Sequence, residues 1–351
     1  MPIIKEANNK VSSNMKLSQC HKDIDQVLDL IVIIFDIVEN KLFSQYDFEY
    51  IKSFIPLWIS DSGRTPESTM TKEVFENLKT NCSDELTNRI LYWFDLQSPI
   101  YALQDRIESV KHIIYELYKL IPNSIKYKDA DYTSAVRYMD SKSSLIHTYI
   151  NVIFVHLASS FDLFKKIVYE LEHIDSLNFS IYSELKSRKD RILYSANKIK
   201  SCELKKTGLI FSNPPILRKI CSFRDYYIHN GSWDYRCVVY GAAVDGIPED
   251  TFVCLPDTDE KGNLIKSGGR NMFYSKGEKI NVTLPQIVSD VMEMYKNSIN
   301  ELAKLYPIKN ECEKILPMDM SDIIKSWYCN AVYNTYTNDK EYICNCLFRK
   351  L

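Results

Sequence analysis

The chain has little glycine and almost no net charge. Nine of its 351 residues are glycine, and 44 basic residues nearly balance 46 acidic ones, which leaves a net charge of −2. A balanced charge excludes a field over the whole molecule that attracts nucleic acid, so any site for RNA must be local. The length allows two domains, or one large domain with additions.

The sequence also lacks the common nucleotide-binding and hydrolase motifs. It has no glycine-rich phosphate loop, no dinucleotide-binding fingerprint and no G-x-S-x-G element. These absences disfavour nucleotide hydrolysis, hydride transfer and serine-hydrolase chemistry.

Metal-binding and membrane signals are missing as well. None of the ten cysteines forms a C-x2-C pair, and none has a histidine at zinc-ligand spacing. We therefore expect reduced thiols, no metal, no cofactor and a cytoplasmic location. The most apolar run, Leu28 to Val38, is too short to cross a bilayer and contains Asp29 and Asp36, so we expect no membrane segment.

Helical periodicity dominates the chain and predicts a mainly α fold. An N-terminal helical region is expected over residues 1–97, a helical bundle over 98–306 and a helical tail over 307–351. Apolar residues that recur every three or four positions predict the long helices, which span about 16–43, 98–121, 143–173, 180–204 and 284–306. A short helix is expected near 321–333.

One part of the bundle has strand composition instead. Short runs rich in β-branched and aromatic residues are separated by glycines, and they lie at 237–240, 251–255, 272–274 and 279–282. Such runs between turn signals predict a small antiparallel sheet, inserted at about 235–282.

Immediately before this insertion, Pro214 to Gly231 reads as a helix with two faces. Asn213 is the expected N-cap, the prolines suit a first turn, and Gly231 supplies a left-handed end. Ile216, Ile220, Phe223 and Tyr227 form an apolar stripe, whereas Arg218, Ser222, Asp225 and His229 form a polar one. Arg224 lies at the margin of the apolar stripe.

The end of this helix, Arg224-Asp225-Tyr226-Tyr227-Ile228-His229, resembles the R-x4-H signature of the HEPN superfamily. The resemblance implies an HEPN-like α-helical bundle. Together with the patterns above, the expected fold is this bundle with an N-terminal helical extension and a small antiparallel β insertion after the motif helix. It implies a metal-independent endoribonuclease that acts as a homodimer, because two copies of the motif meet at the interface of many such proteins. A toxin or anti-phage abortive-defence effector, with an antitoxin or sensor as partner, is the biological role that this resemblance suggests.

The chemistry of RNA cleavage fits these residue types. Histidine can transfer protons near neutral pH, and arginine offers a planar fork of donors to a phosphate. Arg224 and His229 are the implied catalytic pair, with Asp225 as a third residue that could orient the imidazole of His229. One chain supplies one motif histidine, so an acid and a base together require two chains.

Residues near the motif are candidates for binding RNA, and some of the proposed roles have a structural alternative. Asn230, Tyr226 and Lys219 are candidates for phosphate or base contacts, and Trp233 could either stack on a base or pack in the core. Arg224 could simply pair with a carboxylate at the edge of the core. The alternative function is a non-catalytic HEPN-fold module for dimerisation or for binding RNA or nucleotide, and a purely structural helical protein is a third possibility.

Overall fold

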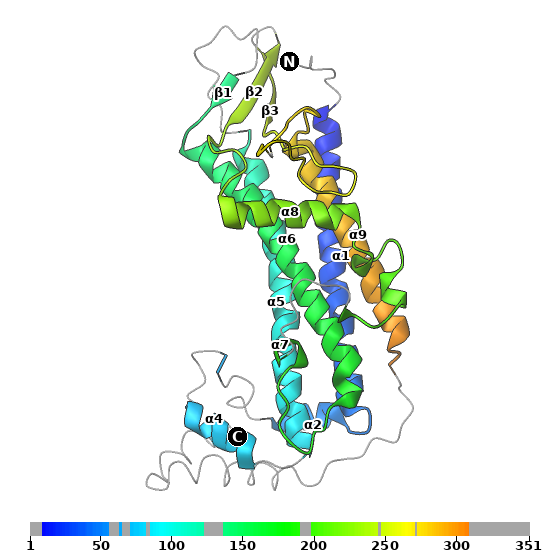
Figure 1. The fold of residues 1–351 in the computed structure, drawn as a ribbon. Coiled ribbons are helices and arrows are strands. Elements are labelled where there is room, and N and C mark those ends of the chain that lie inside the picture. Colours follow the sequence, from blue (N-terminus) through cyan, green and yellow to red (C-terminus); the bar gives the residue numbers. More distant parts are fainter. Residues whose placement is uncertain are drawn as a thin grey trace. The chain divides into compact units, whose positions relative to one another are not determined.

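The computed structural model describes residues 9–55, 63–64, 71–81, 85–122, 136–189, 198–244, 247–270 and 272–308. The protein is mainly helical with a small antiparallel sheet, which confirms the predicted fold class (Figure 1). Contacts divide the chain into two compact units. Unit 1 contains residues 1–33, 101–165 and 200–305, and unit 2 contains 34–100, 166–199 and 306–351.

Three long helices each supply residues to both units, namely α1 (Asn9–Phe43), α5 (Glu85–Leu120) and α6 (Ser141–His173). Their apolar stripes are buried as the periodicity predicts, for example Ile24 and Ile31 on α1 and Ile150 and Leu157 on α6. Unit 2 also contains the short helices α2 (Phe48–Phe54), α4 (Lys72–Asn81) and α7 (Lys186–Lys189).

Several helix boundaries differ from the prediction. Helix α5 begins at Glu85 and runs through Pro99, and α9 (Ile280–Leu305) contains Pro285, so neither proline starts a helix. The predicted helix over 180–204 was wrong: residues 177–185 are not helical, α7 is four residues long, and 190–197 lie outside the described residues. The predicted helix at 321–333, and nearly all of the predicted tail 307–351, also lie outside them.

The sheet has the order β1-β2-β3 and is antiparallel throughout. Strands β2 (Val239–Val244) and β3 (Ile247–Phe252) follow the motif helix as predicted, but β1 (Val136–Tyr138) precedes α6 and was not predicted. Residues 272–274 form no strand, and 279–282 form only one bridge, Cys254 to Lys279, before α9 begins. Arg137 of β1 lies opposite Tyr240 of β2, which lies opposite Phe252 of β3.

The core of unit 1 forms where α6 packs against α9. Phe164 of α6 meets Tyr295 of α9 edge to face, with ring centroids 5.5 Å apart, and the Tyr295 hydroxyl donates to Ser160 Oγ at 2.8 Å. This buried polar pair is satisfied without water. Helix α6 and the turn after it, Ser141–Ser176, are long and apolar enough to cross a membrane, but 56% of the most apolar window is buried inside the protein. A buried core helix passes the same test, so this is weak evidence for a membrane segment.

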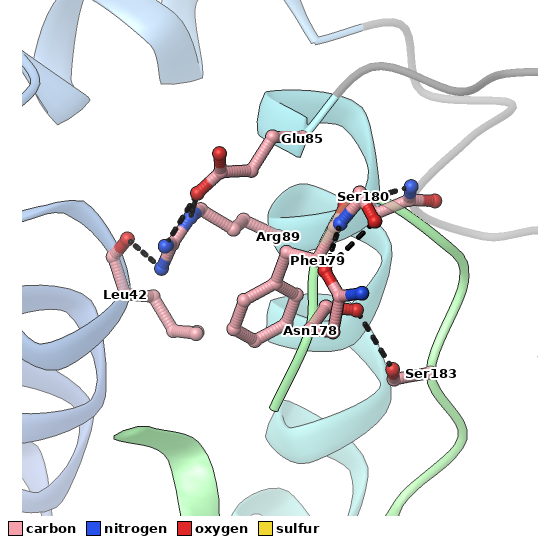
Figure 2. A network of polar contacts seen from close by, with 8 residues as sticks. Leu42, Glu85, Arg89, Asn178, Phe179, Ser180 and Ser183 are labelled. Atoms are coloured by element: carbon pink, nitrogen blue, oxygen red, sulfur yellow. Dashed lines mark hydrogen bonds and ion pairs between the residues drawn. The ribbon is translucent and has the colours of Figure 1, made fainter. Parts of the chain in front are cut away.

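In unit 2, polar contacts attach the loop after α6 to α5, and α5 to α1 (Figure 2). Arg89 of α5 donates to Glu85 and to the carbonyl of Leu42, and its guanidinium lies 4.5 Å from the centre of the Phe179 ring. Asn88 donates to the carbonyl of Phe179 at 3.0 Å. The loop is therefore held by hydrogen bonds and a cation–π contact where a helix was expected.

Candidate active site

The motif helix is α8 (Pro215–Asn230), and its two ends differ from each other in how they are capped. At its start the N-cap is Pro214, with no side-chain hydrogen bond, so the prediction of Asn213 as N-cap was wrong. Asn213 instead ends the preceding turn in a left-handed conformation, at φ 55°. At its end Gly231 has φ 83° and donates its N–H to the carbonyl of Tyr227 at 3.0 Å, as predicted.

The apolar face of α8 packs on α6, which α8 crosses in Figure 1. Leu217, Ile220 and Phe223 are buried, and Phe223 stacks on Phe154 of α6 with ring centroids 5.0 Å apart. Trp233, just after the helix, is 3% exposed and lies 5.3 Å from Phe223. Trp233 therefore packs in the core, which decides between the two roles considered for it.

A buried histidine holds the chain that leaves α8. His147 of α6 is 1% exposed, and its Nε2 lies 3.1 Å from the carbonyl oxygen of Val238. Burial lowers the pKa of His147, which favours a neutral ring that donates to this carbonyl. His147 and Trp233 thus fix the turn between the motif helix and β2.

Arg224 lies at the edge of the core beside two carboxylates. Its side chain is 14% exposed; Nε is 3.1 Å from Asp225 Oδ1, and a terminal nitrogen is 4.0 Å from Asp162 Oδ2. Lys165 Nζ lies 3.1 Å from the other oxygen of Asp162. Arg224 is thus held where α8 crosses α6. Asp162 is a carboxylate at the edge of the core, as the alternative structural role of Arg224 requires.

His229 lies in the last turn of α8 and is exposed, together with Ile228 and Asn230. Within the described part of the chain, Asp225 and His229 form no hydrogen bond with each other, because the Asp225 carboxylate is directed to Arg224. The chain therefore places Arg224 and Asp225 together and leaves the imidazole of His229 open to solvent.

The predicted substrate-binding residues share one side of α8 but lie at different points along its length. Tyr226 is half-buried and precedes His229 by three residues, so the two are neighbours on the helix surface, and Asn230 is next to them. Lys219 lies about two turns before Tyr226 and almost three turns before His229, and it pairs with Glu278 at 2.7 Å. Lys219 thus binds the loop after β3, away from the end that carries His229.

Asp162 is the residue of this site that sequence reasoning missed. From Ser141 to Phe161, α6 carries no acidic residue, so the first carboxylate in an apolar helix was the available signal. Cys221 is a second neighbour: burial raises the pKa of its thiol, and Arg224 opposes this rise. The contact with Asp162 depends on the crossing of α8 and α6, whereas Cys221 is on α8 itself, three residues before Arg224.

Among the described residues, no group of three or more histidine, cysteine, aspartate or glutamate side chains could hold a metal ion. The five cysteines in these segments, Cys20, Cys202, Cys221, Cys237 and Cys254, are all free thiols. Comparisons with models of protein families, with curated proteins and with solved structures found no match. A function for this chain is therefore inferred from the geometry at the end of α8.

Proposed function

We propose that the chain is a metal-independent endoribonuclease, which acts as a homodimer with Arg224 and His229 from each subunit at a shared site. The exposed end of α8 carries this proposal. His229 is open to solvent in the last turn, while Arg224 is anchored against α6 five residues earlier. An exposed proton carrier and an anchored cation on the same helix are two of the groups that phosphodiester cleavage by proton transfer requires.

A second copy would complete this site. Ile228, next to His229, is 54% exposed although it is a large apolar side chain, and a two-fold contact at this end of α8 would cover it. The same contact would bring two imidazoles and two guanidinium groups to one substrate.

The reaction follows from these groups. One His229 removes the proton from a ribose 2′-OH, whose oxygen attacks the neighbouring phosphorus. The P–O5′ bond breaks, and the other His229, protonated, gives its proton to the departing 5′-oxygen. Arg224 balances the negative charge on the non-bridging oxygens. The products are a 2′,3′-cyclic phosphate and a 5′-hydroxyl, which need no metal or cofactor. Toxin or abortive-defence activity is the biological role that fits such an enzyme, with an antitoxin or sensor partner to restrain it.

The second candidate is a non-catalytic module that dimerises or binds RNA or nucleotide. One observation favours it: Arg224 is already neutralised by Asp225 at 3.1 Å and lies near Asp162 at 4.0 Å. An arginine held in this way must leave Asp225 before it can bind phosphate, at some cost in free energy.

Purified wild type and variants, incubated with a labelled single-stranded RNA in EDTA, test the proposal. We expect cleavage by wild type and a rate at least about 100-fold lower for His229→Ala, because general acid–base catalysis contributes at least that factor. Arg224→Ala should lose about as much, because it removes a group that stabilises charge in the transition state. Fragments should carry 2′,3′-cyclic phosphate ends. Induced expression should arrest growth only for the active protein.

His112→Ala is the matched control, since His112 is also an exposed helical histidine, on α5. It should cleave like wild type. If wild type cleaves no RNA and His229→Ala still forms the dimer, the non-catalytic module is the correct function.

A further inference from the structure

One face of the small sheet carries a row of aromatic and basic side chains across all three strands. Arg137, Tyr240 and Phe252 are directly opposite one another in register, and residues opposite in antiparallel strands share a face. The rings of Tyr240 and Phe252 are stacked, with centroids 5.5 Å apart and planes within 16°. Val239 and Gly241 on either side of Tyr240 are buried, so this row lies on the other face of β2.

Cations lie along this row. Lys279 Nζ is 4.2 Å from the centre of the Phe252 ring, and Arg137 is exposed at the opposite edge. Arg236 lies over the ring of Tyr235, which is 82% exposed. Burial raises the pKa of Tyr240, while Arg137 and Arg236 lower it, so both guanidinium groups act on that phenol.

One acidic residue near this row, Asp234, already has hydrogen-bond donors. The carboxylate of Asp234 accepts hydrogen bonds from the backbone N–H groups of Arg236 and Val238, both at 3.0 Å. These bonds shape the turn before β2. The charge of Asp234 still raises the pKa of Tyr240 and Tyr274, but Arg137, Arg236 and Lys279 supply three cations against it.

The row continues to the motif helix through Tyr274. This side chain is 39% exposed, and burial raises its pKa, with smaller contributions from Asp234, Cys254, Tyr240 and Tyr226. The N–H of Asp257, after β3, donates to the carbonyl of Phe273 at 2.6 Å, and Glu278 pairs with Lys219 of α8 at 2.7 Å, so the segment that carries Tyr274 connects the sheet to α8. Tyr226 is in turn a helix-surface neighbour of His229.

We propose that this face, from Phe252 through Tyr240, Tyr274 and Tyr226 to His229, binds single-stranded RNA beside the site of cleavage. Tyr274 is exposed, and Tyr240, Phe252 and Tyr226 are half-buried. Aromatic rings at a surface stack on bases of any sequence, and the cations along the row bind the phosphates between them. A duplex is excluded because its bases are stacked within the helix and do not present their faces. The inference rests on the proposed function for what happens at His229, but binding can be measured without cleavage.

Binding is measured by fluorescence anisotropy with a labelled 12-nucleotide oligo(U), on the full chain carrying His229→Ala so that no RNA is cleaved. Tyr240→Ala should weaken binding about tenfold, as the loss of one stacking ring does. Arg137→Glu should also weaken binding, and its effect should shrink as salt is raised, because it removes a phosphate contact. Arg137 is exposed, so this variant keeps the fold even if Tyr240→Ala disturbs the sheet.

The matched control is a lysine–tyrosine pair on a helix: Lys119 Nζ lies 3.9 Å from the centre of the Tyr115 ring on α5. Tyr115→Ala should bind oligo(U) like its parent. Undiminished binding by both Tyr240→Ala and Arg137→Glu, or equal binding to a 12-base-pair RNA duplex, would overturn the inference. If RNA binding does not depend on the sheet but wild type cleaves RNA, the proposed function stands and this inference is wrong. If binding depends on Tyr240 and Arg137 but wild type cleaves no RNA, the inference stands and the proposed ribonuclease activity is wrong.

Discussion

At the residue scale, the least expected group is a buried carboxylate whose hydrogen bonds, among the described residues, come from neutral donors. Glu170 is 0% exposed and accepts hydrogen bonds from the Tyr92 hydroxyl and from the backbone N–H groups of Lys186 and Ser187. Such a group is stable only while every donor remains in place. Glu170 thus determines the path of the loop after α6.

Glu170→Ala should lower the free energy of unfolding by about 3 kcal/mol, because it leaves two buried N–H groups and one hydroxyl without an acceptor. Tyr92→Phe removes one donor and should cost about 1 kcal/mol. Urea titration followed by circular dichroism measures both. Glu184→Ala, an exposed acid in the same loop, is the control and should have little effect. Equal stability of Glu170→Ala and wild type would show that the loop does not depend on this carboxylate.

The sequence could place the motif residues but not their partners. The spacing from Arg224 to His229, with Gly231 after them, correctly predicts a helix that ends just past an exposed histidine. Asp162 is 62 positions before Arg224, and no local pattern links two residues on different helices. The orientation of Asp225 differs from the prediction for a local reason: the neighbouring guanidinium of Arg224 competes with His229 for the Asp225 carboxylate.

At the element scale, the loop after β3 is attached to the start of α8 by a glycine contact. A Cβ on Gly262 would lie 2.1 Å from the carbonyl oxygen of Pro215 and 2.8 Å from the N of Lys219, and its φ is +88°. Only a residue without a side chain permits this approach. The Lys219–Glu278 pair reinforces the same contact.

Gly262→Ala should therefore lower the free energy of unfolding by about 3 kcal/mol, from backbone strain and from overlap with α8. Gly208→Ala is a close control, because Gly208 has φ +89° and nothing within 4 Å of the added Cβ. It should cost only the strain, about 1 kcal/mol. Thermal denaturation ranks the two, and equal losses would mean that the loop can move away from α8.

Helices that bury a regular stripe were predictable, whereas elements that depend on distant partners were not. The sequence predicts a helix that begins at about residue 98, next to Pro99. Buried residues on both sides of Pro99, such as Leu96 and Leu103, keep α5 continuous instead. Tertiary burial there outweighs the loss of one backbone hydrogen bond. Strand β1 has three residues and pairs with β2 about 100 positions later, so it has almost no local signal.

At the scale of the whole molecule, the proposed dimer predicts a dependence on Ile228. A charge at this 54% exposed position should weaken self-association, because an isologous contact places the same side chain from both subunits near the axis. Ile228→Glu should therefore sediment as a monomer where wild type is a dimer, and RNA cleavage should fall with it. Val32→Glu, at a 52% exposed position on α1, should change neither. A monomeric wild type that cleaves RNA would contradict the shared site.

The stability of the folded chain should also depend on pH through its buried histidines. Burial lowers the pKa of His147, His21 and His156 below the ordinary value. The unfolded chain therefore binds protons that the folded chain does not, so stability is lost as pH falls below about 6.5. The loss is at most about 1.4 kcal/mol per pH unit for each proton.

Urea titrations at pH 7.5 and 5.5 measure this loss, and His147→Gln should reduce it while keeping a donor for the carbonyl of Val238. Carboxylates affect stability in a lower pH range. A hydrogen bond from the Ser143 N–H lowers the pKa of Asp140, so the stability that Asp140 contributes is lost only below about pH 4. A fall in stability that begins only below pH 4 would therefore assign the acid sensitivity to carboxylates. A fall between pH 7.5 and 5.5 that His147→Gln diminishes would assign it to the histidine that holds the turn after the motif helix.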